Sequence, residues 1–152
     1  HNDTKINNIL IDQDTDKALC VIDLDTVMPG SSLYDFGDAI RFCASTAAED
    51  EPDTSKISLN MRAFRLFTEG FLSETNGFLS EEELRNLPLG VLVITCELAM
   101  RFLTDYMDGD IYFKVRSPEH NLVRTRAQMA LLADMEAKYD DMCRMVEEMI
   151  SQ

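Results

Sequence analysis

Residues 1–25, HNDTKINNILIDQDTDKALCVIDLD, contain two short apolar runs, NNILID at 7–12 and ALCVIDLD at 18–25. Both runs are rich in Ile, Leu and Val, and the polar stretch QDTDK at 13–17 separates them. Two such runs on either side of a polar stretch with turn chemistry are typical of a β-hairpin. We therefore predict a hairpin in this part of the chain.

Polar residues that can carry chemistry flank the predicted hairpin: His1, Asp3, Lys5, Asn8 and Asp23. Because the start of the first strand and the end of the second are adjacent in a hairpin, we expect Asp3, Asn8 and Asp23 to lie around one point. Asn8 and Asp23 offer hard oxygen ligands of the kind that Mg²⁺ binds together with substrate phosphates. Asp3 can accept or orient the proton of an attacking hydroxyl group, and Lys5 can offset charge on a transferred phosphoryl group.

From Pro29 and Gly30 onward, the sequence changes to helical periodicity. We predict five helices. The first covers 33–45, with a start near Asp35, and the second covers 57–74. A short third helix opens at the capping box of Ser80 and Glu83, a long fourth runs from Pro88 to the Asp-Gly-Asp stretch at 108–110, and Ser117 and Pro118 open the last. An extended connector at 111–116 separates the last two. The expected fold class is α+β and mostly helical, with one hairpin packed on about five helices.

Apolar residues at spacings of three and four predict the buried faces of three of these helices. In the second helix they are Ile57, Met61, Phe64, Phe67 and Phe71. In the long helix they are Leu89, Leu92, Val93, Cys96, Met100, Leu103 and Met107. In the last helix they are Leu132, Met135, Tyr139, Met142, Val146 and Met149.

Composition limits the classes of partner. The 152 residues, 45% of them hydrophobic, suffice for one domain with a real core. The formal net charge of −14 argues against nucleic acid and an anionic membrane as partners, because both reward clustered Lys and Arg. No segment is expected to reach the ~18 apolar residues of a membrane span. Three of the four cysteines sit in apolar stretches, which predicts reduced, buried thiols and a cytoplasmic location. The acidic stretch 47–53 is expected to be a solvated loop.

HNDTKINNIL at 1–10 has the catalytic-loop spacing H-x-D-x-x-x-x-N, and a strand that ends in Asp23 follows it. Together with CVIDLDTVMPGSSLYDFGDAIRF at 20–42, this stretch resembles the aminoglycoside phosphotransferase and choline kinase superfamily. More narrowly, the chain looks like the N-acetylhexosamine 1-kinases, which phosphorylate the anomeric hydroxyl of N-acetylglucosamine or N-acetylgalactosamine with ATP and Mg²⁺. The resemblance continues through LAMRFLTDYMDGDIYFKVRSPEHNLVRTRAQ at 98–128.

The resemblance implies a role for each matching residue. Asp3 would be the catalytic base, and Asn8 and Asp23 would bind magnesium, with Asp23 also near the sugar. Arg101 and Tyr112 match positions that contact the hexosamine in that family. From the residues alone, Arg101 would instead form a surface ion-pair stripe with the acidic residues at i±4, and Tyr112 would be a packed edge tyrosine.

The resemblance also implies support for the catalytic loop from His1, by packing and hydrogen bonding, and from Asp35, which would also cap its helix. The 152 residues would then be a single domain, the C-terminal lobe of a kinase-like phosphotransferase. The chain has no Gly-rich loop and no ATP-pairing lysine with its partner glutamate, so we expect the N-terminal ATP lobe to be missing. The fragment alone should bind ATP weakly and fail to turn over.

Other functions remain open from the sequence. Within the same superfamily, choline, homoserine and aminoglycosides are alternative acceptors. VIDLDTV at 21–27 also resembles the nucleophile motif of haloacid dehalogenase phosphatases, with Asp23 as nucleophile and Asp25 as acid/base. In the kinase interpretation, Asp25 is a candidate second metal ligand, because it faces the same side of an extended chain as Asp23. A kinase-like lobe that acts as an inactive scaffold is the non-enzyme alternative.

Overall fold

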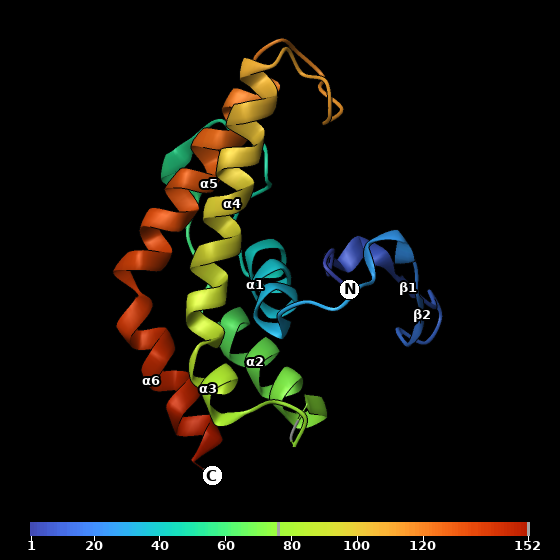
Figure 1. Cartoon of the computed structure of the whole chain (residues 1–152), viewed down its shortest axis with the longest axis vertical. Coiled ribbons are helices and arrows are strands. Elements are labelled where there is room, and N and C mark those ends of the chain that lie inside the picture. Colours follow the sequence, from blue (N-terminus) through green and yellow to red (C-terminus); the bar gives the residue numbers. More distant parts are fainter. Residues whose placement is uncertain (76, 152) are drawn as a thin grey trace.

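The computed structural model describes residues 1–75 and 77–151. In these two ranges it contains one two-stranded antiparallel sheet and six α-helices (Figure 1). In chain order the elements are the 3-10 turn η1 (Ile6–Asn8), β1 (Ile9–Ile11), β2 (Ala18–Val21), η2 (Leu24–Thr26), α1 (Ser32–Cys43), η3 (Thr54–Lys56), α2 (Met61–Thr75), α3 (Glu81–Arg85), α4 (Leu87–Met107), α5 (His120–Ala137) and α6 (Tyr139–Ile150). The predicted mostly helical α+β class is confirmed.

β1 and β2 form the predicted hairpin, in a register that pairs Ile9 with Val21 and Leu10 with Cys20. The strands are shorter than the apolar runs because η1 and η2 take up the residues before and after them. At the turn, Oδ1 of Asp12 accepts hydrogen bonds from the backbone nitrogens of Asp14, at 3.1 Å, and Thr15, at 2.8 Å. This side-chain mimic of a backbone turn is the chemistry expected of an Asp-rich connection.

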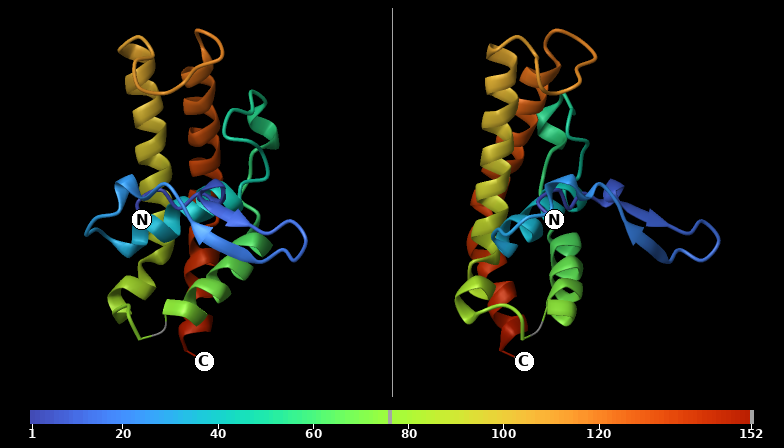
Figure 2. Two further views of the ribbon diagram at one scale, coloured as in Figure 1. Left: turned by 90° about the vertical axis from the view of Figure 1, so that its right-hand side faces the viewer. Right: turned by 45° about the vertical axis from the view of Figure 1, so that its right-hand side comes forward.

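The hairpin projects from the helical body, as the right view of Figure 2 shows. Every residue of β1 and β2 is exposed, and Leu19 and Val21 remain 63% and 52% accessible. The link to the helices therefore runs through η1, which contacts α1, and not through the apolar side chains of the strands. A two-stranded hairpin is at best marginally stable by itself, so these attachments at its open end fix its position.

α1 crosses α4 at a pair of glycines. A Cβ atom placed on Gly37 of α1 would lie 2.5 Å from the carbonyl oxygen of Gly90 of α4, and a Cβ on Gly90 would lie 2.5 Å from the carbonyl oxygen of Leu33. The two backbones thus approach more closely than any side chain would allow. α4 also packs along α5, so that α4 lies between its two main neighbours (Figure 1).

The predicted buried face of α4 is wrong. Leu89, Val93, Met100, Leu103 and Met107 are all exposed, between 39% and 76%. The face that is buried instead consists of Leu87, Gly90, Val91, Thr95, Ala99, Phe102 and Asp105. α4 is apolar on most sides, so apolar spacing could not select a face. Gly90 on this face lets the backbone of α1 approach closely.

The apolar character of α4 also corrects our expectation that no segment is apolar enough for a membrane span. α4 is long and apolar enough to cross a membrane by length and composition, with a mean hydropathy of 1.6 over 18 residues, and 39% of that window is buried within the protein. Packing against α1 and α5 accounts for only part of this composition, because apolar residues such as Met100 and Met107 are exposed.

An aromatic cluster fills the core where α1 meets α2. The ring of Phe36 lies 6.1 Å from that of Phe64, 5.9 Å from that of Phe67 and 5.1 Å from that of Phe71. These are the predicted core residues of the second helix. α2 begins at Met61, later than predicted, because Oδ1 of Asn60 accepts hydrogen bonds from the first-turn nitrogens of residues 62 and 63.

The predicted last helix is two helices that meet at Lys138. Its ammonium group donates to Oδ2 of Asp134 at 2.7 Å, to Oγ of Ser58 at 2.8 Å and to the carbonyl of Leu59 at 2.9 Å. The same Asp134 oxygen accepts the backbone N–H of Leu59 at 2.6 Å. This polar junction ties the segment before α2 to the break. The predicted apolar residues Leu132, Met135, Met142 and Val146 are buried, as expected.

Two further expectations need correction. α5 begins at His120 with Glu119 as its N-cap, whereas Ser117 only accepts a turn hydrogen bond from the backbone nitrogen of His120. The cysteines are not buried as predicted: Cys20 and Cys43 are exposed, and Cys96 and Cys143 are half-buried. The predicted capping box of Ser80 and Glu83 is present at α3, and the long helix ends at Met107, just before 108–110, as predicted.

The glycine crossing predicts the effect of two substitutions. Gly90→Ala should lower the free energy of unfolding by about 1–3 kcal/mol, because its methyl group would meet the backbone of α1, which cannot move aside as a side chain can. Gly70→Ala in α2 is the matched control. No described atom lies within 4 Å of its added Cβ, and better helix propensity should stabilise the protein by roughly 0.5–1 kcal/mol. Urea unfolding measures both values, and equal effects would contradict the proposed backbone contact.

Candidate functional site

The loop before the hairpin is held by α1. The backbone nitrogens of His1 and Asn2 each lie 2.7 Å from a carboxylate oxygen of Asp35, and Oγ1 of Thr4 donates to the Asp35 carbonyl at 2.6 Å. Oγ1 of Thr26, after β2, donates to the carbonyl of His1 at 2.7 Å. Asp35 thus contacts the loop that we expected it to support. The N-cap of α1 is a different residue, Ser31, so the expectation that Asp35 caps the helix is wrong.

The His1 ring links this loop to the segment after β2. Its Nε2 lies 3.1 Å from the carbonyl oxygen of Ile22. Because a carbonyl oxygen can only accept, Nε2 carries the proton of this hydrogen bond. Nδ1 is buried and has no hydrogen-bond partner in the described part of the chain. The ring therefore makes a structural contact between the loop and the hairpin.

Asp3 is oriented by two of the residues predicted to act with it. Its Oδ2 accepts hydrogen bonds from Nζ of Lys5 at 2.8 Å and from Nδ2 of Asn8 at 3.0 Å. Nδ2 of Asn8 also donates to the Asp3 carbonyl at 2.8 Å. Asn8 is buried, whereas the Asp3 and Lys5 side chains are 29% and 34% exposed. The carboxylate is therefore fixed in direction and still accessible.

The structure brings the backbone of Asn8 next to that of Asp23. The nitrogen of Ile22 donates to the carbonyl of Asn8 at 2.9 Å, and Asp23 is the following residue. Asp23 is exposed, adopts a left-handed conformation with φ of 59°, and immediately precedes η2 as its N-cap residue. This conformation turns the chain sharply after β2.

The donor atoms of these two residues suit a hard cation. Nδ2 of Asn8 faces Asp3, which leaves the amide oxygen of Asn8 as its possible ligand atom. Within residues 1–75 and 77–151, no three His, Cys, Asp or Glu side chains gather as a metal site, so Asp25 does not complete a carboxylate cluster. An amide oxygen and one carboxylate fit Mg²⁺, which takes its other ligands from water and phosphate.

A cavity of about 710 Å³ lies between this loop and the helices. Asp3 and Lys5 line one part of it, and Arg101 and Tyr112 line another. Residues from α1, α4, α5 and the acidic stretch complete its wall. The cavity thus gathers four predicted site residues from segments a hundred positions apart in the sequence.

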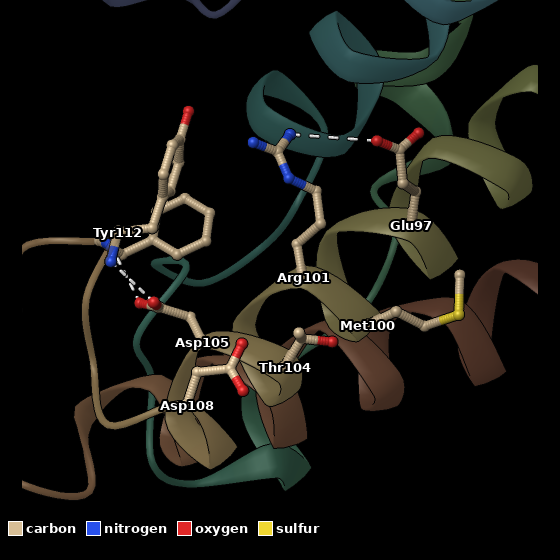
Figure 3. Close-up of a pocket in the computed structure, with 8 residues that line it drawn as sticks. Glu97, Met100, Arg101, Thr104, Asp105, Asp108 and Tyr112 are labelled. Carbon is tan, nitrogen blue, oxygen red and sulfur yellow. Dashed lines mark hydrogen bonds and ion pairs between the residues drawn. The ribbon is translucent and has the colours of Figure 1, made fainter.

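Arg101 and Tyr112 also share a smaller pocket of about 400 Å³, shown in Figure 3. The Arg101 guanidinium lies 5.6 Å from the ring centroids of both Tyr112 and Phe113. Its Nη1 lies 3.9 Å from the carboxylate of Glu97, a long and exposed ion pair. Of the predicted ion-pair stripe, the structure thus has the pair of Arg101 with Glu97, the acidic residue at i−4. The acidic residue at i+4, Asp105, has other partners.

Asp105 was missed as a site residue by sequence analysis. Its two carboxylate oxygens accept the backbone N–H groups of residues 111, 112 and 113 at 2.9, 2.7 and 2.9 Å. Nδ2 of Asn121 donates to it at 2.8 Å. Burial alone would raise the pKa of Asp105, but these hydrogen bonds outweigh it, so its pKa lies below the ordinary value of 3.8. No sequence pattern distinguishes this aspartate from others near a helix end.

The acidic stretch 47–53 is not simply solvated, which corrects another expectation. Oε1 of Glu49 accepts a hydrogen bond from Nη1 of Arg41 at 2.8 Å, and the same arginine pairs with Asp38 at 2.9 Å. Oδ2 of Asp50 lies 3.0 Å from Nε2 of the buried His120. The stretch therefore closes one side of the cavity through buried and half-buried ion pairs.

The lowered pKa of Asp105 predicts a pH dependence. Because the folded protein stabilises the carboxylate, the contribution of Asp105 to stability is complete above its unfolded pKa and is lost as pH falls through its folded pKa. Asp105→Asn should therefore lose less stability than the unsubstituted protein between about pH 5 and about pH 3. Urea unfolding midpoints at the two pH values measure this difference. Parallel losses in the two proteins would show that Asp105 does not titrate below its ordinary range.

Comparison with known protein families agrees with this geometry. Residues 1–60 match the family model described as the phosphotransferase enzyme family, APH. The matched range includes the loop with Asp3 and Lys5, the hairpin with Asn8 and Asp23, and α1. The stretch that carries one side of the cavity is thus similar to the APH phosphotransferase family.

Proposed function

We propose that this chain forms the acceptor-binding and catalytic part of an ATP- and Mg²⁺-dependent phosphotransferase. Its acceptor is a small hydroxylated compound, and the one best supported is an N-acetylhexosamine, phosphorylated on its anomeric hydroxyl group. One observation carries the proposal. The phosphotransferase-like stretch presents Asp3 and Lys5 to the same cavity as Arg101 and Tyr112, the two positions that resemble sugar contacts of the N-acetylhexosamine 1-kinases.

In this proposal, Asp3 accepts the proton of the attacking hydroxyl group. Lys5 and Asn8 both contact the carboxylate at Oδ2, and within the described residues Oδ1 remains available to a substrate hydroxyl. Lys5 lies 2.8 Å from Asp3, where its charge can offset negative charge on the transferred phosphoryl group. Most of the catalytic work in phosphoryl transfer is such positioning and charge stabilisation.

Asn8 and Asp23 would hold the magnesium ion through oxygen atoms. When bound, Mg²⁺ neutralises phosphate oxygens and orients the phosphoryl group. The hairpin serves this role because the hydrogen bond between the Asn8 carbonyl and the nitrogen of Ile22 fixes both strand ends. His1 and Asp35 keep the loop in place by the contacts described above and take no part in the chemistry.

The charge of the cavity favours a neutral sugar over a cationic acceptor. The chain has twice as many acidic residues as basic ones, 28 against 14. The cavity lining lacks this acidic excess, with five basic residues and four acidic ones: Lys5, Arg41, Arg101, Lys114 and Arg124 against Asp3, Asp38, Glu49 and Glu97. A polycationic aminoglycoside or choline would gain little there. Homoserine, which carries no net charge, remains the alternative acceptor within the superfamily.

The phosphatase alternative has lost its structural support. Haloacid dehalogenase phosphatases need strands that alternate with helices, and here β2 pairs only with β1, antiparallel, within the described residues. The run of helices that follows leaves Asp23 without the further strands of that fold. The inactive-scaffold alternative is distinguished by the activity assay below.

We also propose that a nucleotide-binding lobe completes the enzyme on the N-terminal side of these residues, as the family resemblance implies. Activity is therefore assayed with the full-length protein, and the 152-residue chain serves as a comparison that should bind ATP weakly. Normal ATP turnover by the 152-residue chain would contradict the proposal that nucleotide binding requires a further lobe.

Asp3→Asn should reduce phosphorylation of N-acetylgalactosamine by about 10²–10⁴-fold, the usual contribution of a general base. ³¹P NMR identifies the product as the 1-phosphate. Asp14→Asn is the matched control, because it makes the same chemical change in the exposed hairpin turn. Retained activity in Asp3→Asn would remove Asp3 as the base. Phosphorylation of homoserine and not of the sugar would replace the hexosamine by that acceptor.

Arg101→Lys should raise the KM for the sugar about tenfold and change kcat less, because lysine keeps the charge but loses the planar stacking on Tyr112. Arg65→Lys is a close control. Arg65 forms an i,i+4 ion pair with Glu69 and is 53% exposed, much like Arg101 with Glu97, but it lies on α2 and does not line the cavity. Steady-state kinetics at varied sugar concentration measure both. Equal KM values in the two variants would exclude Arg101 from the acceptor site.

A further inference from the structure

We propose that Asp105 is a positioning residue that sets the affinity for the acceptor by holding Tyr112 and Phe113 against Arg101. The proposal rests on the proposed function, since it assumes that the acceptor is bound beside these side chains. Asp105 follows Arg101 by one helical turn on α4, and the residues that it holds belong to the loop after that helix. α4 thus carries both Arg101 and Asp105, the residue that positions the aromatic partners of Arg101.

The Asp105 carboxylate is directed at three consecutive backbone N–H groups of the loop. Oδ1 accepts those of Ile111 and Tyr112, and Oδ2 accepts that of Phe113. Figure 3 shows the carboxylate against the backbone nitrogen of Tyr112, with the Arg101 side chain extending from the preceding turn of α4. Asp105 is 6% exposed, so water competes little for these hydrogen bonds.

Asn121 of α5 completes the arrangement. Its Nδ2 donates at 2.8 Å both to Asp105 and to Oδ1 of Asp110, and its side chain is fully buried. Asp110 has a φ of 59°, and its nitrogen donates to the carbonyl of Asp105 at 2.7 Å. The beginning and the middle of the loop are therefore bound to the same two buried side chains.

Burial does not place Tyr112. Tyr112 is 73% exposed and Ile111 is 81% exposed, so burial contributes little to the position of this part of the loop. The Tyr112 ring contacts the guanidinium of Arg101 at 5.6 Å and the ring of Phe113 at 4.8 Å, and Asp105 holds the backbone of both aromatic residues. Loss of the Asp105 hydrogen bonds would free the ring while leaving Asp3 and the hairpin unchanged.

The test separates placement of the loop from general stability. Asp105→Asn keeps the shape of the side chain but removes its charge and replaces one acceptor oxygen by an NH2 group, which can only donate. We expect the KM for N-acetylgalactosamine to rise about tenfold or more, with kcat within about twofold, in the full-length protein well below its melting temperature. Hydrogen exchange of the amides of residues 111–113 should become faster.

Asp134→Asn is the matched control. The Asp134 carboxylate also accepts a hydrogen bond from the backbone of an irregular segment, the N–H of Leu59, and the pKa of Asp134 is also lowered. It is a structural carboxylate that does not line the cavity. This variant should lose comparable stability and leave both KM and kcat unchanged. If the KM rises equally in the two variants, the effect of Asp105→Asn comes from lost stability and not from the position of Tyr112, and the proposal is overturned.

Asp110→Gly gives a second route if Asp105→Asn does not fold. Glycine accepts the positive φ of this position but removes the hydrogen bond to Asn121, and Asp110→Asn, which keeps an acceptor oxygen, should rescue it. A raised KM in Asp110→Gly with rescue supports the proposal, and an unchanged KM overturns it. If the unsubstituted protein phosphorylates no hexosamine or homoserine, the proposed function fails. Normal activity in every variant refutes only the role of the loop.

Discussion

The close approach of α1 to α4 is the constraint on which the rest of the structure depends. Gly37 and Gly90 let the two backbones meet where any larger side chain would collide. α1 carries Asp35, which holds the loop with Asp3, and α4 carries Arg101. The distance across the cavity is therefore set by the backbone contact at the glycine crossing. A cavity built on backbone contact is more rigid than one built on flexible side chains.

Aspartates hold three separate segments by the same device. Asp35 contacts backbone nitrogens of the catalytic-type loop, Asp105 accepts those of the loop after α4, and Asp134 accepts that of Leu59. In each case a helix presents a carboxylate to a segment of irregular backbone. A helix fixes the carboxylate, and hydrogen bonds from N–H groups to an anion are stronger than those to a neutral acceptor. These carboxylates add to apolar packing near the buried Leu59, whereas at the exposed Ile111 and Tyr112 burial contributes little.

Much of the fold could be predicted from local sequence, but the site only in part. The hairpin, the helix order, the capping box of Ser80 and the aromatic core around Phe64 follow from periodicity and turn chemistry, and the structure has them. The buried face of α4 could not be predicted, because a helix that is apolar on most sides has no distinct stripe. The break at Lys138 and the role of Asp105 depend on partners distant in sequence, such as Ser58 and Asn121, for which a single sequence contains no signal.

The exposed hairpin has a consequence for the behaviour of the protein in solution. Its strands leave unpaired edges and apolar side chains in water, a surface that favours association between molecules. Asp12, Asp14 and Asp16 at its tip, and the net charge of −14 of the whole chain, oppose such contacts by mutual repulsion. This repulsion vanishes near the isoelectric point of about 4.4. The exposed hairpin edges are therefore free to associate on the acid side of neutrality, where the charge that keeps the molecules apart is lost.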